Sequence, residues 1–407
     1  MTRIGFAYNQ KPESPHRFGL AESAARRGDD EPPSMRRDAA SRDFRSPASA
    51  KADARLAAPA RPLDGDDRFA EWDSADTINA VAAALAHRGD VVMLEATLDF
   101  PERLRAASPD IVFNIAEGLN GVNRESHVPA ICEFYDIPYS GSDPFTLSLC
   151  LDKARTKEIL GIHGVATAPF AVATSVDDLA AIARGSSRVP APTVGSPLFI
   201  KPVHEGSSKG ITERNFVRTT DQLLAQGSAL LTGYAQPVLV ETFLPGAEFT
   251  CGVLGNGAAA IMLPIVAINF DSLPAGAVPI YGFEAKWIWD TPADPLEIFE
   301  CPARIPDSLR QGIEDVVLRA YRVLGCRDWA RVDVRLDVAG VPNVVEVNPL
   351  PGILPDPKDN SCLPKAARAA GIDYDTLIQR CLMHAAERSG VAFNTPTHPR
   401  RTLEGVA

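Results

Sequence analysis

Two strand-like runs near the C-terminal end of the chain carry polar side chains at alternate positions. RVDVRL contains Arg331 and Asp333, and VVEVN contains Glu346 and Asn348. Successive side chains of a strand point to opposite faces, so each run has one polar and one apolar face. The intervening VAGVP is typical of a hairpin turn. Antiparallel pairing of the two runs would therefore set Asp333 beside Glu346 and Asn348.

This polar face could bind a metal ion. Two carboxylates and an amide carbonyl are hard oxygen ligands of the kind that Mg²⁺ prefers, with substrate phosphates completing its shell. Arg331 would lie on the same face and could neutralise a phosphate or an oxyanion. A solvated hairpin face shows the same alternation, so these residues alone leave both interpretations open.

A second group of residues could bind phosphate. The loop HEGSSKG contains small residues that let backbone N–H groups approach phosphate oxygens closely, although the pattern G-x-x-x-x-G-K-[ST] is absent. An ordinary flexible turn is the alternative. Lys201 precedes the loop on an otherwise apolar strand, where a lysine needs a phosphate partner or a surface edge. Lys153 opens a helix, and Glu241 ends the apolar strand VLVETFL, where it could accept from an adenine amine or a ribose hydroxyl.

The elements around these residues indicate an α/β chain. Residues 3–9 and 110–118 are predicted strands, and apolar residues at helical spacing predict a helix that ends near Gly89. This β-α-β-β order is typical of an open parallel sheet, which places ligands at the C-terminal ends of its strands. Further predicted elements are a helix at 124–135, a short strand and turn at 137–143, a helix from Asp152, helices at 176–184, 219–231, 307–324 and 373–388, and the strand–loop–strand unit 197–211.

Composition limits the function classes. The 407 residues allow two or three domains, and the net charge of −11 disfavours a nucleic-acid binder. No apolar run approaches the roughly 20 residues that span a bilayer. Seven cysteines without a C-x-x-C pair fit a reducing compartment, so we expect a cytoplasmic protein with no membrane or nucleic-acid partner. Residues 10–68 are rich in Arg, Asp, Ala, Ser and Pro, which predicts a disordered insertion.

In order, the chain contains DK, FIKP–HEGSSKG, VLVETFLPGAEFT, EAK, ARVDVRLD and EVNPLPG. This series resembles the D-alanine–D-alanine ligase family of the ATP-grasp superfamily, from about residue 110 to 388. The resemblance implies a fold of α/β and α+β class. An N-terminal open parallel-sheet domain, 1–150, would precede a two-subdomain ATP-grasp fold at 151–245 and 246–390, with 391–407 as a flexible tail.

The resemblance implies a role for each matching residue. ATP would contact Lys153, Lys201, Glu205, Ser208, Glu241, Leu244, Glu248 and Lys286. Asp333, Glu346 and Asn348 would hold two Mg²⁺ ions, with Mn²⁺ as a possible substitute. Arg331, the backbone N–H of Gly352 and Ser207 would act in catalysis, and Ser361 and Trp287 would meet the substrate. A carboxylate would attack the γ-phosphate of ATP, and an amine would then attack the resulting acyl phosphate.

The chain departs from the family pattern near the amino-acid site. In the family a Ser–Glu pair normally follows the first strand, and its Glu holds the ammonium of the first substrate. That pair is missing after this first strand, and Glu13 or Glu22 are weak substitutes. Trp287 stands where the family usually has Tyr, and the loop 352–364 is longer than usual. The substrates could therefore be two D-alanines, or other amino acids or an amino-acid conjugate. An ATP-binding regulator without activity is a third interpretation, which the retained Arg331 and metal ligands disfavour. The family expectation for assembly is a homodimer.

Overall fold

The computed structural model of the chain describes residues 2–12, 69–186, 188–274, 276–282, 285 and 296–393. Several sequence-based expectations lie outside these residues. They are residues 13–68 of the insertion predicted at 10–68, with Glu13 and Glu22, the two site residues Lys286 and Trp287, and residues 394–407 of the predicted tail.

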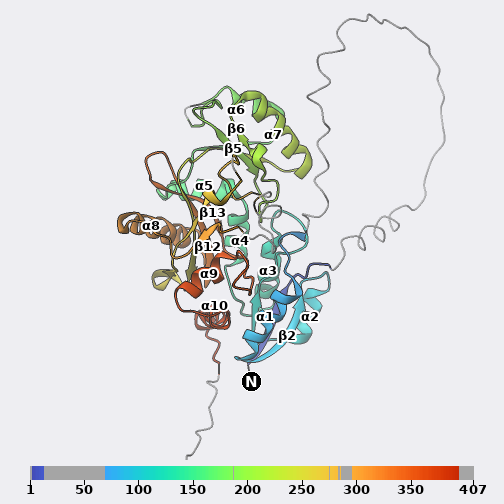
Figure 1. The fold of residues 1–407 in the computed structure, drawn as a ribbon. Helices are drawn as coiled ribbons and strands as arrows, with labels where there is room; N and C mark the ends of the chain where they lie inside the picture. Colours follow the sequence, from blue (N-terminus) through green and yellow to red (C-terminus); the bar gives the residue numbers. More distant parts are fainter. Residues whose placement is uncertain are drawn as a thin grey trace, which may run out of the picture. The chain divides into compact units, whose positions relative to one another are not determined.

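The first of the sheets formed by the described residues is parallel, as predicted. Strand β1 (Arg3–Tyr8) lies between β2 (Asp90–Glu95) and β3 (Ile111–Asn114). Three helices accompany this sheet: α1 (Ala75–Ala86), α2 (Phe100–Ala107) and α3 (His127–Phe134), the last preceded by the short 3₁₀ helix η3 (Arg124–Ser126) (Figure 1). Helix α1 begins after Ser74, whose hydroxyl accepts from the N–H of Thr77.

One predicted strand is smaller than expected. The segment 137–143 pairs with the sheet only through an isolated bridge between Tyr139 and Val112. Pro138 has no N–H to extend the ladder, although its carbonyl accepts from the N–H of Val112.

The second sheet is antiparallel, in the order β4 (Phe170–Ala173), β7 (Val238–Thr242), β5 (Leu198–Pro202) and β6 (Phe216–Val217). Helices α6 (Val176–Ala183) and α7 (Thr220–Tyr234) pack on it and on each other (Figure 1). Helices α4 (Pro144–Leu151) and α5 (Lys153–Ile162) connect this part of the chain to the first sheet.

The third sheet has the order β11 (Phe299–Glu300), β10 (Val266–Ile268), β8 (Glu248–Leu254), β12 (Trp329–Leu336) and β13 (Pro342–Asn348), and β9 (Ile261–Met262) pairs with β8. Helix α8 (Asp307–Val323) lies between β11 and β12 along the chain, and α9 (Cys362–Ala369) and α10 (Tyr374–Ser389) follow β13. Helix α9 was not predicted, because it begins inside the segment that the sequence assigned to a loop. The predicted hairpin is confirmed: β12 and β13 are antiparallel, Asp333 pairs with Glu346, and Arg331 pairs with Asn348.

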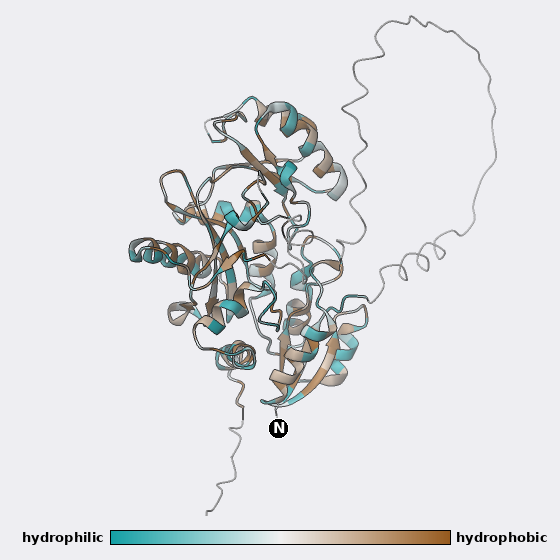
Figure 2. Cartoon of the chain, in the orientation of Figure 1, coloured by the Kyte–Doolittle hydropathy of each residue, from teal (hydrophilic) through white to brown (hydrophobic). Residues whose placement is uncertain are grey.

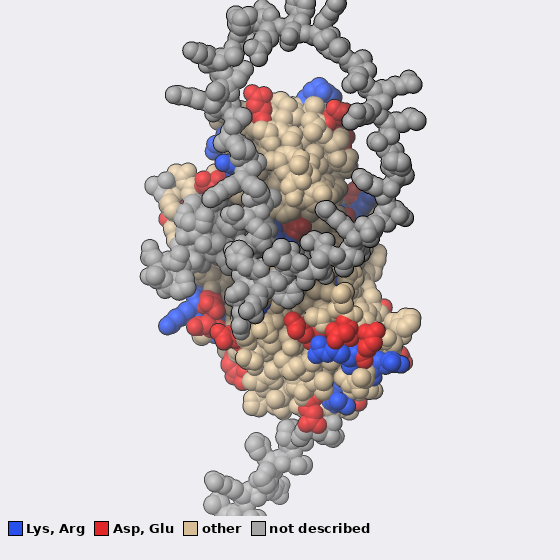
Figure 3. All heavy atoms as spheres, turned by 90° about the vertical axis from the view of Figure 1, so that its right-hand side faces the viewer, with Lys and Arg blue, Asp and Glu red and all other residues tan. Residues whose placement is uncertain are grey.

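The main hydrophobic core joins β1 and α1, near the start of the chain, to α10. Ile4 and Phe6 of β1 and Leu85 of α1 belong to the same buried cluster as Leu377 and Leu382 of α10. Figure 2 shows hydrophobic residues concentrated on the strands, while α8 presents hydrophilic residues. On the face in Figure 3, acidic and basic side chains are interspersed over its lower part. No helix among the described residues is both long and apolar enough to cross a membrane.

Candidate active site

A cavity of about 440 Å³ is lined by residues from the second and third sheets and by segments next to β1 and β3. This volume suits a small-molecule ligand. It brings together most of the residues singled out from the sequence: Lys201, Glu205, Ser207, Ser208, Glu241, Leu244, Glu248, Arg331, Asp333, Glu346, Asn348, Gly352 and Ser361. Lys153 is buried beside this set.

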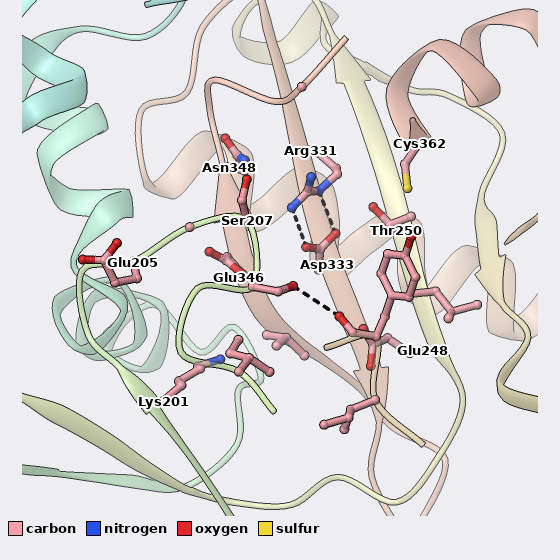
Figure 4. A pocket seen from close by; sticks show the side chains of 18 of the residues that line it. Lys201, Glu205, Ser207, Glu248, Thr250, Arg331, Asp333, Glu346, Asn348 and Cys362 are labelled. Carbon is pink, nitrogen blue, oxygen red and sulfur yellow. Dashed lines mark hydrogen bonds and ion pairs between the residues drawn. The ribbon is translucent and has the colours of Figure 1, made fainter. Parts of the chain in front are cut away.

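The hairpin face is a set of paired charges. Arg331 donates from Nε and Nη2 to the two carboxylate oxygens of Asp333, at 3.0 and 2.9 Å (Figure 4). Lys153 Nζ lies 3.1 Å from Glu346 Oε1. Burial opposes ionisation of Glu346, but Lys153, Lys201 and Arg331 outweigh it and lower the pKa of this carboxyl to about 2. Glu346 is therefore held ionised by neighbouring cations.

The donors on this face fit a divalent cation that also has ligand oxygens. Asp333 and Glu346 face one another in register, and Asn348 lies two residues further along β13. The Asn348 side-chain oxygen accepts from the N–H of Leu350 at 2.9 Å, which leaves it a second lone pair. Among the described residues, no group of three His, Cys, Asp or Glu side chains could hold a metal ion. A metal here would accordingly need the Asn348 amide or oxygens from a bound ligand.

Glu241 lies between two buried lysines. Its carboxylate oxygens are 2.9 Å from Lys157 Nζ and 3.0 Å from Lys201 Nζ. Burial raises the pKa of Glu241, yet the two lysines together lower it to about 2. Sequence reasoning missed Lys157. Its signal was its position one helical turn after Lys153 in DKARTK, which turns both lysines to the same side of α5.

Arg335 was also missed, although it stands on the same strand face as Arg331 and Asp333. It donates from Nη1 to Glu248 Oε2 at 2.7 Å and from Nη2 to the carbonyl of Pro279 at 2.9 Å. Its guanidinium carbon lies 4.6 Å from the ring centroid of Phe243. These contacts hold Glu248 at the wall of the cavity.

The glycine-rich loop between β5 and β6 has an unusual backbone. Ser207 and Ser208 adopt φ of 49° and 61°, the left-handed region that non-glycine residues rarely occupy. Ser208 Oγ donates to the carbonyl of Tyr281 at 3.2 Å, and Lys153 Nζ donates to the carbonyl of Glu205. Backbone conformations of this kind persist where surrounding contacts hold them, and they are common at ligand-binding loops.

Glu71 connects this loop to the first sheet. It accepts from Arg124 Nη2 at 2.9 Å, from Lys209 Nζ at 2.9 Å and from the N–H of Gly206 at 3.0 Å. Glu71 stands three residues before Ser74, which caps α1, so it occupies the connection from β1 to α1. Sequence reasoning overlooked it, because the long segment 13–68 separates it from β1.

Ser361 lies at the N-terminal end of α9 and organises the loop before that helix. Its hydroxyl donates to the carbonyl of Gly352 at 3.2 Å and accepts from the N–H of Leu354 at 3.1 Å. The side chains of Ser361 and Cys362 both border the cavity.

The chain has an N-terminal parallel sheet followed by two antiparallel sheets, and the cavity between these elements is rich in lysines and carboxylates. This combination is that of the ATP-grasp ligases. The fold is similar to two crystal structures of D-alanine–D-alanine ligase from Bacillus anthracis, one of them complexed with ATP. They have TM-scores of 0.59 and 0.62 at 21% and 22% identity, and each match covers 96% of this chain and 99% of the other.

Sequence comparison gives the family. Residues 159–383 match the family model described as D-ala D-ala ligase C-terminus. The chain is 34% identical over 308 residues to the D-alanine–D-alanine ligase of Cupriavidus metallidurans, covering 75% of this chain and 85% of the relative. It is 35% identical over 289 residues to that of Bordetella petrii, covering 70% and 78%. The chain belongs to the D-alanine–D-alanine ligase family, which confirms the expected family, fold and class of ATP-dependent, ADP-forming ligase.

Proposed function

We propose that the chain forms a peptide or amide bond by activating a carboxylate with ATP as an acyl phosphate, which an amine then attacks. The observation that carries this proposal is the cluster of Arg331, Asp333, Glu346 and Asn348 on one face of the β12–β13 hairpin, with Lys153 ion-paired to it. A reaction of this kind needs positioning and charge neutralisation rather than a side-chain nucleophile.

The paired charges explain how the same residues serve both a metal and phosphate. Asp333, Glu346 and Asn348 would hold Mg²⁺, as two ions, or Mn²⁺, which would neutralise phosphate charge when bound. Arg331 and Lys153 compensate the two carboxylates in this structure. They would then turn to oxyanion and phosphate oxygens, with the Gly352 N–H beside Arg331 at the oxyanion.

The remaining residues divide between the nucleotide and the loop that covers it. Lys201 and Lys286, the latter outside the described residues, would contact phosphates. Ser207 and Ser208 would close over them, and Leu244 and Glu248 would border the adenosine. Glu205 belongs to the same loop, where Lys209 and Gln236 hold its carboxylate. For Glu241 we propose a positioning role, because its carboxylate holds Lys157 and Lys201 in place.

The substrates are amino acids in this proposal. D-Alanine is the first candidate, because the Cupriavidus and Bordetella relatives are named for it. Glu71 occupies the place in the chain where the family has its ammonium-binding glutamate, but Arg124 and Lys209 already hold it. This observation favours the second candidate, a ligase for other amino acids or an amino-acid conjugate, with Ser361 and Trp287 at the substrate.

The test is release of ADP and phosphate from ATP and Mg²⁺ with a panel of amino acids, singly and in pairs, followed by product masses. A D-alanyl-D-alanine mass from D-alanine alone would establish the first candidate. Turnover only with another pair would establish the second. Bound ATP without turnover across the panel would contradict the ligase proposal and favour a regulatory ATP-binding protein.

A further inference from the structure

Two carboxylates beside the cavity have no partner among the described residues. Glu117 follows β3, and Glu125 lies in η3; neither forms a hydrogen bond or ion pair with another described residue. Glu125 is only 8% exposed. Both line a small chamber of about 30 Å³ whose other walls include Ser207, Glu346 and Asn348, and Glu117 also borders the main cavity.

The neighbouring acids are paired with cations or amides, whereas the negative charge of Glu117 and Glu125 has no such compensation. Glu71 is held by Arg124 and Lys209, and Glu346 by Lys153. Burying a carboxylate without a partner is unfavourable. Among the described residues, no Lys, Arg or His lines the chamber, which therefore lacks a positive group.

The size and polarity of the chamber fit an ammonium group. A polar space of about 15 Å³ suffices for one water-sized group, and the chamber is larger than that. An ammonium group is water-sized and has three donors to share between carboxylates. A bare divalent metal fits less well, because no three carboxylate, His or Cys side chains among the described residues are arranged to hold one.

The walls indicate which molecule carries this ammonium. Glu346 and Asn348 are shared between the chamber and the hairpin face where the carboxylate of the first substrate would be phosphorylated. In an α-amino acid a single carbon separates the ammonium from the carboxylate, so the two groups would reach these neighbouring places together. We propose that Glu117 and Glu125 bind the ammonium of the amino acid whose carboxylate is activated, an inference that rests on the proposed function.

This assignment gives the two sets of acids separate tasks. Glu71 fastens the glycine-rich loop through Gly206 and Lys209, while Glu117 and Glu125 select an amine-bearing substrate. An amine held as ammonium between carboxylates has no lone pair to attack an acyl phosphate. The activated amino acid would thus not compete with the true acceptor amine.

The test compares each amino acid that supports ADP release with its deaminated counterpart, in the full chain with ATP, Mg²⁺ and a constant acceptor amine. We expect the wild-type chain to prefer the amino acid. Glu117→Gln and Glu125→Gln should each raise the KM for the amino acid by about 10- to 100-fold, the range for a lost charged hydrogen bond. The KM for ATP and for the deaminated acid should stay unchanged.

Glu102→Gln, at an exposed position of α2, is the matched control and should alter none of these values. A thermal midpoint no lower than that of the wild type shows that the Gln variants fold. Equal use of amino and deaminated acids by the wild type, or an amine preference that survives in both Gln variants, would overturn the inference while the ligase proposal stands. Absence of ADP release with every acid would instead refute the ligase proposal and, with it, this inference.

Discussion

At the scale of single residues, the proposed function assigns the hairpin acids to the metal ion that would neutralise phosphate charge. Asp333 faces Glu346 across β12 and β13 and is paired with Arg331 in this structure. A carboxylate that holds a charge-neutralising metal ion would contribute to rate far more than to folding.

Asp333→Ala should leave the fold in place and reduce kcat by about 10³-fold, by analogy with the loss of other charge-stabilising groups. The measurements are kcat for ADP release and the thermal midpoint. Glu314→Ala, on the exposed side of α8, is the control and should keep full activity. Near-normal turnover without the Asp333 carboxylate would remove this residue from the site.

Glu241 should matter for stability, because it compensates two buried lysines. Glu241→Gln is expected to destabilise the chain by about 3 kcal/mol near neutral pH, since Lys157 and Lys201 lose their shared partner. Glu158→Gln breaks the exposed pair with Arg155 and should change stability far less, because water and salt screen an exposed ion pair. Denaturant unfolding of the two variants tests the contrast.

The pH dependence of this effect has a definite sign. The pKa of Glu241 is about 2 in the folded chain, below its ordinary 4.5. Its stabilising contribution is therefore complete above pH 4.5 and is lost as the pH falls toward 2. The stability difference between wild type and Glu241→Gln should shrink across that window, and a difference that stays constant would contradict the assignment.

At the scale of elements, the turn between β3 and η3 depends on a glycine. Gly118 has φ of 82°, and a Cβ at this position would collide with the carbonyl oxygen of Arg124. Gly121 has a similar φ of 87°, but a Cβ there would meet nothing within 4 Å. The two glycines therefore have the same left-handed backbone, and only Gly118 is closely approached by another part of the chain.

The two glycines form a matched pair of tests. Gly121→Ala should cost about 1 kcal/mol for the left-handed backbone alone. Gly118→Ala should cost roughly 3 kcal/mol, because Arg124 must also move, and it should weaken the hold on Glu71. Urea unfolding of both variants gives the comparison, and equal losses would show that the contact with Arg124 is unimportant.

At the scale of the whole molecule, two of the hydrophobic clusters share no residue. One cluster lies within the second sheet and its helices and includes Leu223, whereas another joins β1 and α1 to α10 and includes Ile378. We predict two calorimetric unfolding transitions, one for each cluster. Leu223→Ala should reduce the free energy of unfolding of the first cluster, and Ile378→Ala that of the second, each by about 3 kcal/mol. Each substitution should lower the midpoint temperature of its own transition.

The cavity is lined by residues of the second sheet and by residues next to β1. Binding of ATP with Mg²⁺ should therefore raise the midpoint temperatures of both transitions and bring them closer together. A single transition whose midpoint both substitutions lower equally would show that the cores unfold as one unit.

The homodimer expected from the family stays a prediction that sedimentation can test.

Much of the fold and site followed from local pattern. Alternation along a strand places Arg331 and Asp333 on one face whatever the surroundings, because the backbone itself imposes a period of two. The hairpin turn then brought Glu346 opposite Asp333, as predicted. The order of strands and helices likewise indicated the parallel first sheet.

Tertiary structure alone decided which charges meet. Glu71 with Lys209, Glu241 with Lys157, and Glu248 with Arg335 are pairs between segments whose separation along the chain follows no rule. Glu117 and Glu125 are ordinary acids in the sequence, and only their place at the chamber, without a partner among the described residues, makes them candidates for substrate recognition. Backbone periodicity determines the face on which a side chain lies, but the partners it meets depend on how distant segments pack.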